Sequence, residues 1–443
     1  MKIYSTYNDS GILWIRKKPE NWAVCRSKAL FQSQKETNLN NKETNVLSLT
    51  LKGVIRNNKD KPIGLSPSDY STYQIFEKGD LVFKLIDLNN IATSRVGLVP
   101  ERGIMSSAYI RLIPRSADLR TRYFYMQYYS LWLRNIFNNL GAGVRQTINA
   151  NELLNMKIVV PSPSEQDQIV RFLDWKVSSI NKLIRTKIKE INLLRELKQV
   201  LINKELLAKS NRERVPLKRY VKSNRESLSE RTSENHRIEY LDIGSVGYGY
   251  IKKKPKYYTF SEAPSRARRI VRSGDTIIST VRTYLRSVCY IDDDFDGCIV
   301  STGFCVLTPN HQIVPEFLGF VLSSDAFINE VVRASVGTSY PAINESKLLS
   351  IKISLPEHID EQRKIISDLS KKLEKIDRTI SYINDLIVTY KELKTRLISD
   401  VVTGQIDVRN IEIPEYEYVD EELESDSDDV DGDFDSEDIS EEA

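Results

Sequence analysis

Apolar residues alternate at spacings of three and four through residues 361–397, the a and d pattern of a coiled coil. Glu and Lys occupy most other positions, no Pro or Gly interrupts the run, and only Lys394 breaks the apolar seam. The pattern predicts one continuous helix of roughly 40 residues, which is about 60 Å long at 1.5 Å per residue. A single helix of this kind cannot bury its seam, so a partner helix is required.

The same pattern occurs about 196 positions earlier, from Val170 to Leu201, so the partner helix is predicted to lie in the same chain. One polar position recurs, because Lys198 corresponds to Lys394, whereas Lys187 interrupts the earlier copy alone. The residues expected to form the interface of the helix pair are Val177, Ile180, Ile184, Ile191, Leu194, Leu373, Ile376, Ile380, Ile383, Ile387 and Tyr390.

The similarity of the two halves extends beyond the helices. The first half contains Ile148-Asn149, Leu153-Leu154, Lys157-Ile158, Pro161 and Glu165-Gln166. The same residues recur in the same order in the second half, as Ile343-Asn344, Leu348-Leu349, Lys352-Ile353, Pro356 and Glu361-Gln362. Phe76-Glu-Lys-Gly-Asp80 also aligns with Val271-Arg-Ser-Gly-Asp275. In the first segment, the glycine is predicted to form a turn that leads into a strand. Between these repeated segments the halves share little, which favours one frame that presents two different binding surfaces.

The repeat predicts an α+β fold with an internal pseudo-two-fold duplication. The expected boundaries are 1–161 and 211–356 for two mixed α/β units, 162–210 and 357–410 for the long helix after each, and 411–443 for a disordered acidic tail. Within the first unit, a helix is expected from Tyr123 to Asn138 and a flexible glycine loop from Gly141 to Asn149.

The composition is ordinary for a globular protein, with 40% hydrophobic and 28% charged residues among 443. Neither a signal peptide nor a run of about 18 apolar residues is present, which predicts a cytoplasmic protein without a membrane span. The four cysteines have no C-x-x-C spacing and no His at ligand spacing, so we expect reduced, mostly buried thiols and no metal site.

Charge is distributed unevenly along the chain. Residues 415–443 contain about 16 acidic residues and no Lys or Arg, and such a block is expected to stay disordered. Removing its charge from the formal net charge of +3 leaves about +19 on the remaining residues. A basic body favours a polyanionic partner, although Lys and Arg that merely solvate helix surfaces would give the same count.

Two clusters in the second unit suggest contacts with nucleic acid. Arginine side chains can clamp phosphates or bond guanine with two parallel hydrogen bonds, and neighbouring aromatic rings strengthen the pattern. The candidates for DNA binding are Lys252, Lys253, Lys254, Arg266, Arg268, Arg269, Arg272, Arg282, Tyr284 and Arg286 in the second unit, and Lys84, Arg95 and Arg145 in the first. Surface solvation with internal ion pairs is the alternative explanation for these residues.

Sequence patterns typical of catalysis are missing. The chain has no G-x-x-x-x-G-K-[ST] loop and no G-x-G-x-x-G opening a helix after a strand, and its three histidines have no evident triad partners. We therefore expect a non-catalytic protein, with an enzyme hidden in the divergent units as a remaining alternative.

The order of unit, long helix, unit, long helix resembles the specificity subunit of a type I restriction-modification enzyme. The resemblance is carried by Gly143-Val-Arg-Gln-Thr-Ile-Asn149, by the Leu-Leu, Lys-Ile and Pro residues that follow, and by Glu165-Gln166, with their second copies. It covers nearly the whole chain up to about Arg409.

The resemblance implies that each α/β unit is a target-recognition domain that reads one half of an asymmetric bipartite DNA site. Two antiparallel helices would set the spacer and dock two methyltransferase (modification) subunits and two restriction or motor subunits. S-adenosylmethionine, ATP and Mg would belong to those partners, with no cofactor on this chain. The acidic tail departs from the pattern. The alternative function is a coiled-coil scaffold without sequence-specific DNA binding.

Overall fold

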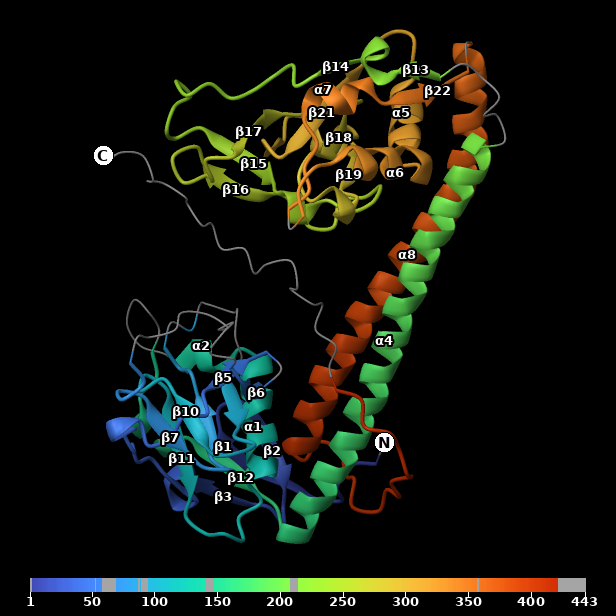
Figure 1. Cartoon of the computed structure of the whole chain (residues 1–443). Helices are drawn as coiled ribbons and strands as arrows, with labels where there is room; N and C mark the ends of the chain where they lie inside the picture. The colour runs from blue at the N-terminus through green and yellow to red at the C-terminus, as the bar shows by residue number, and fades with distance from the viewer. Residues whose placement is uncertain are drawn as a thin grey trace, which may run out of the picture. The chain divides into compact units, whose positions relative to one another are not determined.

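The computed structural model describes residues 2–51, 53–57, 69–86, 88, 95–140, 147–207, 214–338, 340–356 and 358–420. The chain divides into two compact units (Figure 1). Among the described residues, those between 2 and 187 and between 384 and 420 form unit 1, and those between 188 and 383 form unit 2. Each of the two long helices, α4 (Pro163–Leu207) and α8 (Ile359–Val402), therefore contributes one part to each unit.

Unit 1 contains twelve strands and three short helices besides its parts of α4 and α8. In chain order they are β1 (Tyr7–Ile12), β2 (Ile15–Pro19), β3 (Ala23–Arg26), β4 (Phe31–Gln32), β5 (Leu47–Thr50), β6 (Gly53–Arg56), β7 (Gln74–Phe76), β8 (Leu81–Phe83), β9 (Val96–Leu98), β10 (Gly103–Met105), β11 (Ile110–Pro114), α1 (Thr121–Leu133), α2 (Ile136–Leu140), α3 (Ala150–Asn155) and β12 (Lys157–Val160). These counts refer to the described residues.

Unit 2 repeats the sequence of elements in part. Its described elements are β13 (Arg214–Pro216), β14 (Val221–Ser223), β15 (Arg237–Leu241), β16 (Lys256–Thr259), β17 (Ala267–Ile270), β18 (Thr276–Ser279), β19 (Val288–Tyr290), β20 (Ile299–Ser301), β21 (Phe304–Pro309), α5 (Pro315–Leu322), α6 (Asp325–Ala334), α7 (Glu345–Ser350) and β22 (Lys352–Ser354).

One antiparallel four-stranded sheet occurs in both units. Its order is β4-β11-β8-β9 in unit 1 and β14-β21-β18-β19 in unit 2. Helix α1 packs against β9 in the first sheet, and α5 packs against β18, β19 and β21 in the second (Figure 1). The two-stranded sheets β12-β3 and β13-β22 also correspond, so the duplication predicted from the sequence is present in the fold.

The turn predicted before the central strand is confirmed. Gly79 has φ +93° and begins the turn into β8, and its repeat Gly274 has φ +92° before β18. Glycine suits this left-handed conformation because it has no Cβ. In each turn an aspartate closes the loop, since Asp80 accepts from the N–H of Glu77 and Asp275 from that of Arg272, both at 2.8 Å.

Every residue predicted for the interface of the helix pair is buried or partly buried. In unit 2, Ile202 of α4 forms an apolar cluster with Leu369 and Leu373 of α8. The Lys198 ammonium lies 2.5 Å from Asp377, and the Lys372 ammonium lies 2.5 Å from Glu205. Residue numbers therefore rise along one helix as they fall along the other in unit 2.

In unit 1 the polar seam residue Lys394 is only 5% exposed, and its Nζ lies 3.5 Å from Asn181 Oδ1. The predicted break in the seam is thus accommodated by a polar partner on the other helix, as the burial of an ammonium requires.

Two expectations need correction. The helix predicted from Tyr123 to Asn138 ends at Leu133 and resumes at Ile136, because Asn135 has φ +54° and cannot continue a right-handed helix.

The prediction of disorder from residue 411 onward is wrong for residues 411–420. Ser178 and Asn181 of α4 donate to the carbonyls of Glu417 (3.0 Å) and Val419 (3.1 Å), and Val419 is 7% exposed. Residues 421–443, which hold most of the predicted tail, lie outside the described residues.

Candidate nucleic-acid interface

A pair of loops recurs at the same place in both units. One segment connects a central strand to the edge strand beside it, β8 to β9 (residues 84–95, of which 84–86, 88 and 95 are described) or β18 to β19 (residues 280–287), and we call it the strand loop. The other precedes α3 (residues 141–149) or α7 (residues 335–344), and we call it the helix loop. The two units share one corresponding main-chain bond between these segments: Ile148 donates to Leu85 at 3.0 Å, and Ile343 donates to Thr280 at 2.8 Å.

The repeated Ile-Asn pair explains this geometry. Ile148 and Ile343 are each 3% exposed and anchor the loop in the core. The asparagine that follows caps the next helix, because Asn149 accepts from Glu152 N (3.0 Å) and Asn344 from Lys347 N (2.8 Å). These sequence identities therefore position the loops.

In unit 2 the two loops are joined by further bonds. Val281 of the strand loop pairs with Ala342 of the helix loop. The Thr283 hydroxyl lies 2.8 Å from that of Ser335, and the Thr283 N–H points to the Pro341 carbonyl at 3.4 Å. The loops thus form one surface, which we call the loop platform (residues 280–287 and 335–344, with Ser339 not described).

Two of the predicted arginines lie on the platform in a strained conformation. Arg282 (φ +50°, ψ +47°) and Arg286 (φ +55°, ψ +35°) are left-handed and flank the short 3-10 helix Thr283–Leu285. For a residue with a Cβ this conformation costs roughly 1–2 kcal/mol, and such strain is typical of functional sites.

The two arginines have different partners. The guanidinium of Arg282 lies over the ring of Tyr340, 4.8 Å from its centroid. That of Arg286 bonds Asp325 at 2.8 Å and lies 5.6 Å from the ring centroid of Tyr248.

The platform also exposes large apolar side chains. The exposed fractions are 51% for Tyr284, 37% for Leu285, 68% for Val336 and 62% for Tyr340. Neighbouring exposed apolar residues on tied loops mark an interaction surface. Tyr284 is among the residues predicted from the sequence, whereas Tyr340 is not. The one sequence signal for Tyr340 is its position just before the repeated Ile343-Asn344 pair.

The Arg-dense segment forms an edge strand. Residues 267–270 are β17, at one edge of the sheet β16-β15-β20-β17. Arg266 is exposed, Arg268 stacks on Phe260 with its Cζ 4.9 Å from the ring centroid, and Arg269 is partly buried. Arg272 bonds Glu226 at 2.7 Å, which raises the pKa of Arg272 and lowers that of Glu226.

The predicted lysines lie elsewhere on the same sheet. Lys252, Lys253 and Lys254 are exposed and precede β16, the opposite edge strand. Strands β15 and β20 separate β16 from β17, so the two basic clusters of unit 2 do not merge into one.

The candidates of unit 1 map to its own loop pair. Lys84 and Arg95 lie at the two ends of the strand loop, where Lys84 N–H bonds the Arg95 carbonyl at 3.0 Å. Arg95 is 2% exposed and its guanidinium reaches the Ile86 carbonyl at 3.3 Å, so it lies inside the unit and not on its surface. Arg145 lies outside the described residues.

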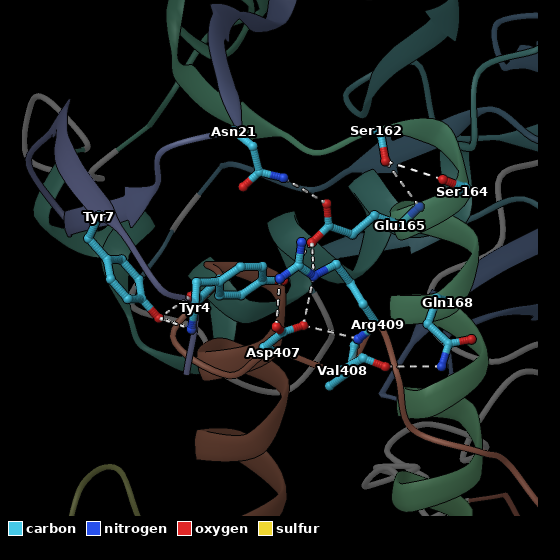
Figure 2. A network of polar contacts seen from close by, with 11 residues as sticks. Tyr4, Tyr7, Asn21, Ser162, Ser164, Glu165, Gln168, Asp407, Val408 and Arg409 are labelled. Carbon is cyan, nitrogen blue, oxygen red and sulfur yellow. Dashed lines mark hydrogen bonds and ion pairs between the residues drawn. The ribbon is translucent and has the colours of Figure 1, made fainter. Parts of the chain in front are cut away.

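Polar contacts near the start of α4 join chain segments far apart in sequence (Figure 2). The Tyr4 hydroxyl donates to Glu165 Oε1 at 2.6 Å, and Arg409 lies 4.0 Å from the same carboxylate and 4.8 Å from the Tyr4 ring centroid. Asp407 holds Arg409 at 2.8 Å. Burial, with the Glu165 bond, raises the pKa of Tyr4, and the hydrogen bond from Arg409 lowers the pKa of Asp407.

The Glu-Gln pair at the start of each long helix is therefore a structural joint. Gln166 donates to the Pro161 carbonyl at 2.9 Å, and its repeat Gln362 donates to the Pro356 carbonyl at 3.1 Å. Each amide ties the first turn of the helix to the proline that follows the preceding strand.

The cysteines of unit 2 are unsuited to nucleophilic chemistry. Burial raises the pKa of Cys289 to about 12, that of Cys298 to about 11 and that of Cys305 to about 12, so the thiols stay protonated at neutral pH. In the described parts of the chain, no group of His, Cys, Asp and Glu is arranged to hold a metal ion, and no helix is long and apolar enough to cross a membrane.

Comparison with known proteins adds a family assignment. Residues 19–193 and 219–387 match the family described as the type I restriction modification DNA specificity domain. The MjaVIII specificity subunit of Methanocaldococcus jannaschii is 24% identical over 336 residues, which cover 70% of this chain and 76% of that protein. The HindI specificity subunit of Haemophilus influenzae is 30% identical over 131 residues, 28% of each chain.

A solved structure has a similar fold. It comes from work on complex assembly and conformational transition of the type I R-M system, and superposes with a TM-score of 0.57. The match covers 88% of this chain and 99% of the other at 14% sequence identity, so it supports the two-unit α+β fold.

Proposed function

Because the chain belongs to the type I restriction modification DNA specificity family, we propose that each of its two units reads one half of an asymmetric, bipartite DNA site. The chain would supply DNA sequence specificity to a restriction-modification complex and perform no catalysis itself.

The observation that carries this proposal is the repeated loop pair. The same main-chain tie, Ile148 to Leu85 and Ile343 to Thr280, holds loops whose sequences differ between the units. One frame with two different loop sets fits two different half-sites, because side chains on loops held by a rigid frame determine what is bound. An asymmetric target follows.

The proposed DNA contacts are of two kinds. Exposed Lys252, Lys253, Lys254 and Arg266 suit phosphates, because such contacts need charge and reach but no fixed geometry. The platform residues Arg282, Tyr284 and Arg286 suit base edges, because loops tied at several points fix their orientation. Arg268 and Arg269 would contact DNA from the edge strand, and Arg272, which follows that strand, would exchange Glu226 for a phosphate. In unit 1, Lys84 and Arg145 remain proposed contacts, whereas Arg95 is buried and would support its loop.

We further infer that α4 and α8 pair as an antiparallel coiled coil that fixes the unread spacer and docks the other subunits. The support is that each helix has a part in both units and that charged pairs such as Lys198–Asp377 join the two helices. Two methyltransferase and two restriction subunits, which would bring S-adenosylmethionine, ATP and Mg, are the proposed partners in the cytoplasm.

The test is genome-wide detection of methylated adenine in cells that carry the chain with its methyltransferase partner. We expect a split motif with an unread spacer, lost when the chain is deleted. Exchange of residues 214–356 with the same segment of a relative should change one half of the motif, and exchange of residues 23–160 should change the other. Methylation that persists without the chain would refute the proposal, and unchanged motifs after both exchanges would favour a scaffold.

A further inference from the structure

We propose that Asp325 fixes the position of the loop platform of unit 2 along the long helix α4, and is thereby a positioning residue for the spacer between the two half-sites. The inference rests on the proposed function, because it presumes that α4 and α8 set the spacer and that the platform reads DNA. Asp325 lies outside every cluster predicted from the sequence.

Asp325 is the first residue of α6, and it bonds residues from three other segments of unit 2. Its carboxylate accepts from the side chain of Asn203 on α4 at 2.6 Å. The same carboxylate accepts from Arg286 of the platform at 2.8 Å and from the Tyr248 hydroxyl at 3.1 Å. The long helix and the platform are therefore joined through one side chain.

The contact between Asp325 and α4 consists of two hydrogen bonds in opposite directions. Asn203 Nδ2 donates to Asp325 Oδ2 at 2.6 Å, while the Asp325 N–H donates to Asn203 Oδ1 at 2.9 Å. Each bond requires both a distance and an angle to be met, so the two together define an orientation as well as a contact. This pair holds the start of α6 at one place on α4.

Two further polar contacts lie on the same face of α4. Gln199 donates to the Tyr248 carbonyl at 3.4 Å, and the Arg195 guanidinium lies over the Tyr250 ring, 4.2 Å from its centroid. Arg195, Gln199 and Asn203 are four residues apart, so they form one row along the helix. A shift by one helical turn, about 5.4 Å, would break all of these contacts, and they therefore specify one position of the α/β part of unit 2 on α4.

The contact between Asp325 and the platform is an ion pair. Arg286 follows the 3-10 helix of the strand loop with φ +55°, and its guanidinium also reaches Asn329 Oδ1 of α6 at 3.4 Å. The side chains of Arg286 and Asp325 are 40% and 46% exposed, so the pair adds little to stability. Its effect is on position, because it bonds the platform to the residue that is bonded to α4. The place of the platform along the helix then holds for whichever of its side chains contacts DNA.

The first unit provides a comparison. Asn203 corresponds to Ser399 of α8 through the offset that relates Lys198 to Lys394. In unit 1, Ser399 lines a cavity of about 920 Å³ together with Trp14. The repeated frame therefore forms with this helix position facing a cavity, so the contact between Asn203 and Asp325 is not a general requirement of the frame.

Substitutions of Asn203 test the contact without altering the platform. Asn203→Ala removes both hydrogen bonds, and Asn203→Asp also places a second carboxylate beside that of Asp325. Asn203 is partly exposed and is not a proposed DNA contact, so the variants should fold and the platform should still read its bases. Asn203→Asp combined with Asp325→Asn exchanges donor and acceptor and restores the pair. Ser399→Ala is the matched control on the other long helix.

The experiment measures adenine methylation in cells that carry each chain, its methyltransferase partner and a plasmid with three target sites. The sites share the half-sites of the wild-type motif, and their spacers have the native length, one base pair more and one base pair fewer. Asn203→Ala and Asn203→Asp should lower the preference for the native spacer, because the platform can then occupy neighbouring positions along α4. We expect a loss of roughly 5-fold, which corresponds to the contribution of about 1 kcal/mol from a hydrogen bond. The double variant should recover the wild-type preference, and Ser399→Ala should retain it.

The outcomes separate this inference from the proposed function. If the wild-type chain gives no split motif, or methylates all three spacers equally, the proposed function fails. If the wild type prefers one spacer and Asn203→Ala keeps that preference, or the double variant does not recover it, only the present inference is overturned. Degenerate bases in a half-site with an unchanged spacer preference would also overturn it, because the contact would then act on base reading. So would loss of all methylation by Asn203→Ala in an assembled complex, because the contact would then serve the fold.

Discussion

Replacement of Tyr4 by Phe tests whether the hydrogen bond between the first residues of the chain and the start of α4 stabilises unit 1. The Tyr4 hydroxyl and the Glu165 carboxylate are 2.6 Å apart, and the two residues are 3% and 4% exposed. A hydrogen bond to a buried charge contributes about 1.5–3 kcal/mol. Without it, Glu165 Oε1 keeps the weaker contact with Arg409 at 4.0 Å, while Asn21 donates to the other oxygen, Oε2, at 3.5 Å. We expect the free energy of unfolding to fall by about 2 kcal/mol.

Tryptophan fluorescence during urea unfolding measures this change in unit 1 alone. All four tryptophans, at positions 14, 22, 132 and 175, belong to unit 1, and the Trp22 ring lies 5.9 Å from that of Tyr4. The urea midpoint should fall with an unchanged m-value. Tyr257→Phe is the control, because Tyr257 is 77% exposed in unit 2 and its hydroxyl should not affect the signal.

A double-mutant cycle identifies the bond itself. In the Glu165→Gln background, Tyr4→Phe should cost clearly less than in the wild type, because the charge that strengthens the hydrogen bond is absent. A cost below about 0.5 kcal/mol in the wild type, or an equal cost in both backgrounds, would refute the reasoning.

Three further predictions follow from the structure. The hydrogen bond from Arg409 lowers the pKa of Asp407 in the folded chain, so the ionised carboxylate stabilises the fold above its ordinary pKa of about 4, and this stabilisation is lost as pH falls through the folded pKa. Asp407→Asn should therefore reduce the loss of stability at acid pH in a pH titration followed by fluorescence. An unchanged acid dependence would contradict this prediction. Leu369 is 0% exposed, so Leu369→Ala should lower the free energy of unfolding by about 2–5 kcal/mol, measured by urea unfolding with circular dichroism detection. Leu393 is 50% exposed, so Leu393→Ala should change the same free energy by less than about 0.5 kcal/mol. Replacement of Lys252, Lys253 and Lys254 by Gln should reduce the slope of log affinity against log salt by about 2–3 for any DNA sequence in anisotropy titrations, and an undiminished slope would exclude phosphate contacts there.

Local patterns in the sequence were sufficient to predict the long helices and one of the turns. The spacing of apolar residues predicted both long helices and the burial of their seam, since a helix face is fixed by residues three and four apart. The glycine turn before β8 was also predictable, because the left-handed conformation of Gly79 is a property of a few neighbouring residues.

Contacts between distant residues could not be read in this way. The segment 411–420 was assigned to the acidic tail and predicted to be disordered, yet α4 residues about 240 positions away donate hydrogen bonds to it. Burial of Arg95 and the position of Tyr340 beneath Arg282 depend on the arrangement of whole loops. A residue type predicts what a side chain can bond, whereas its partner is determined by the tertiary fold.

The residues repeated between the two halves and the residues that differ have separate roles. The repeated residues make structural contacts at the ends of elements. Asn149 and Asn344 cap short helices, and Gln166 and Gln362 bond the start of each long helix to the proline after the preceding strand. They fix where the loops begin and end, so side chains between them can change without loss of the frame. The strained backbone of Arg282 lies within such a loop, where a local cost of roughly 1–2 kcal/mol does not disturb these contacts. This division explains why exchange of a loop-bearing unit should alter the DNA sequence that is read while the folded chain persists.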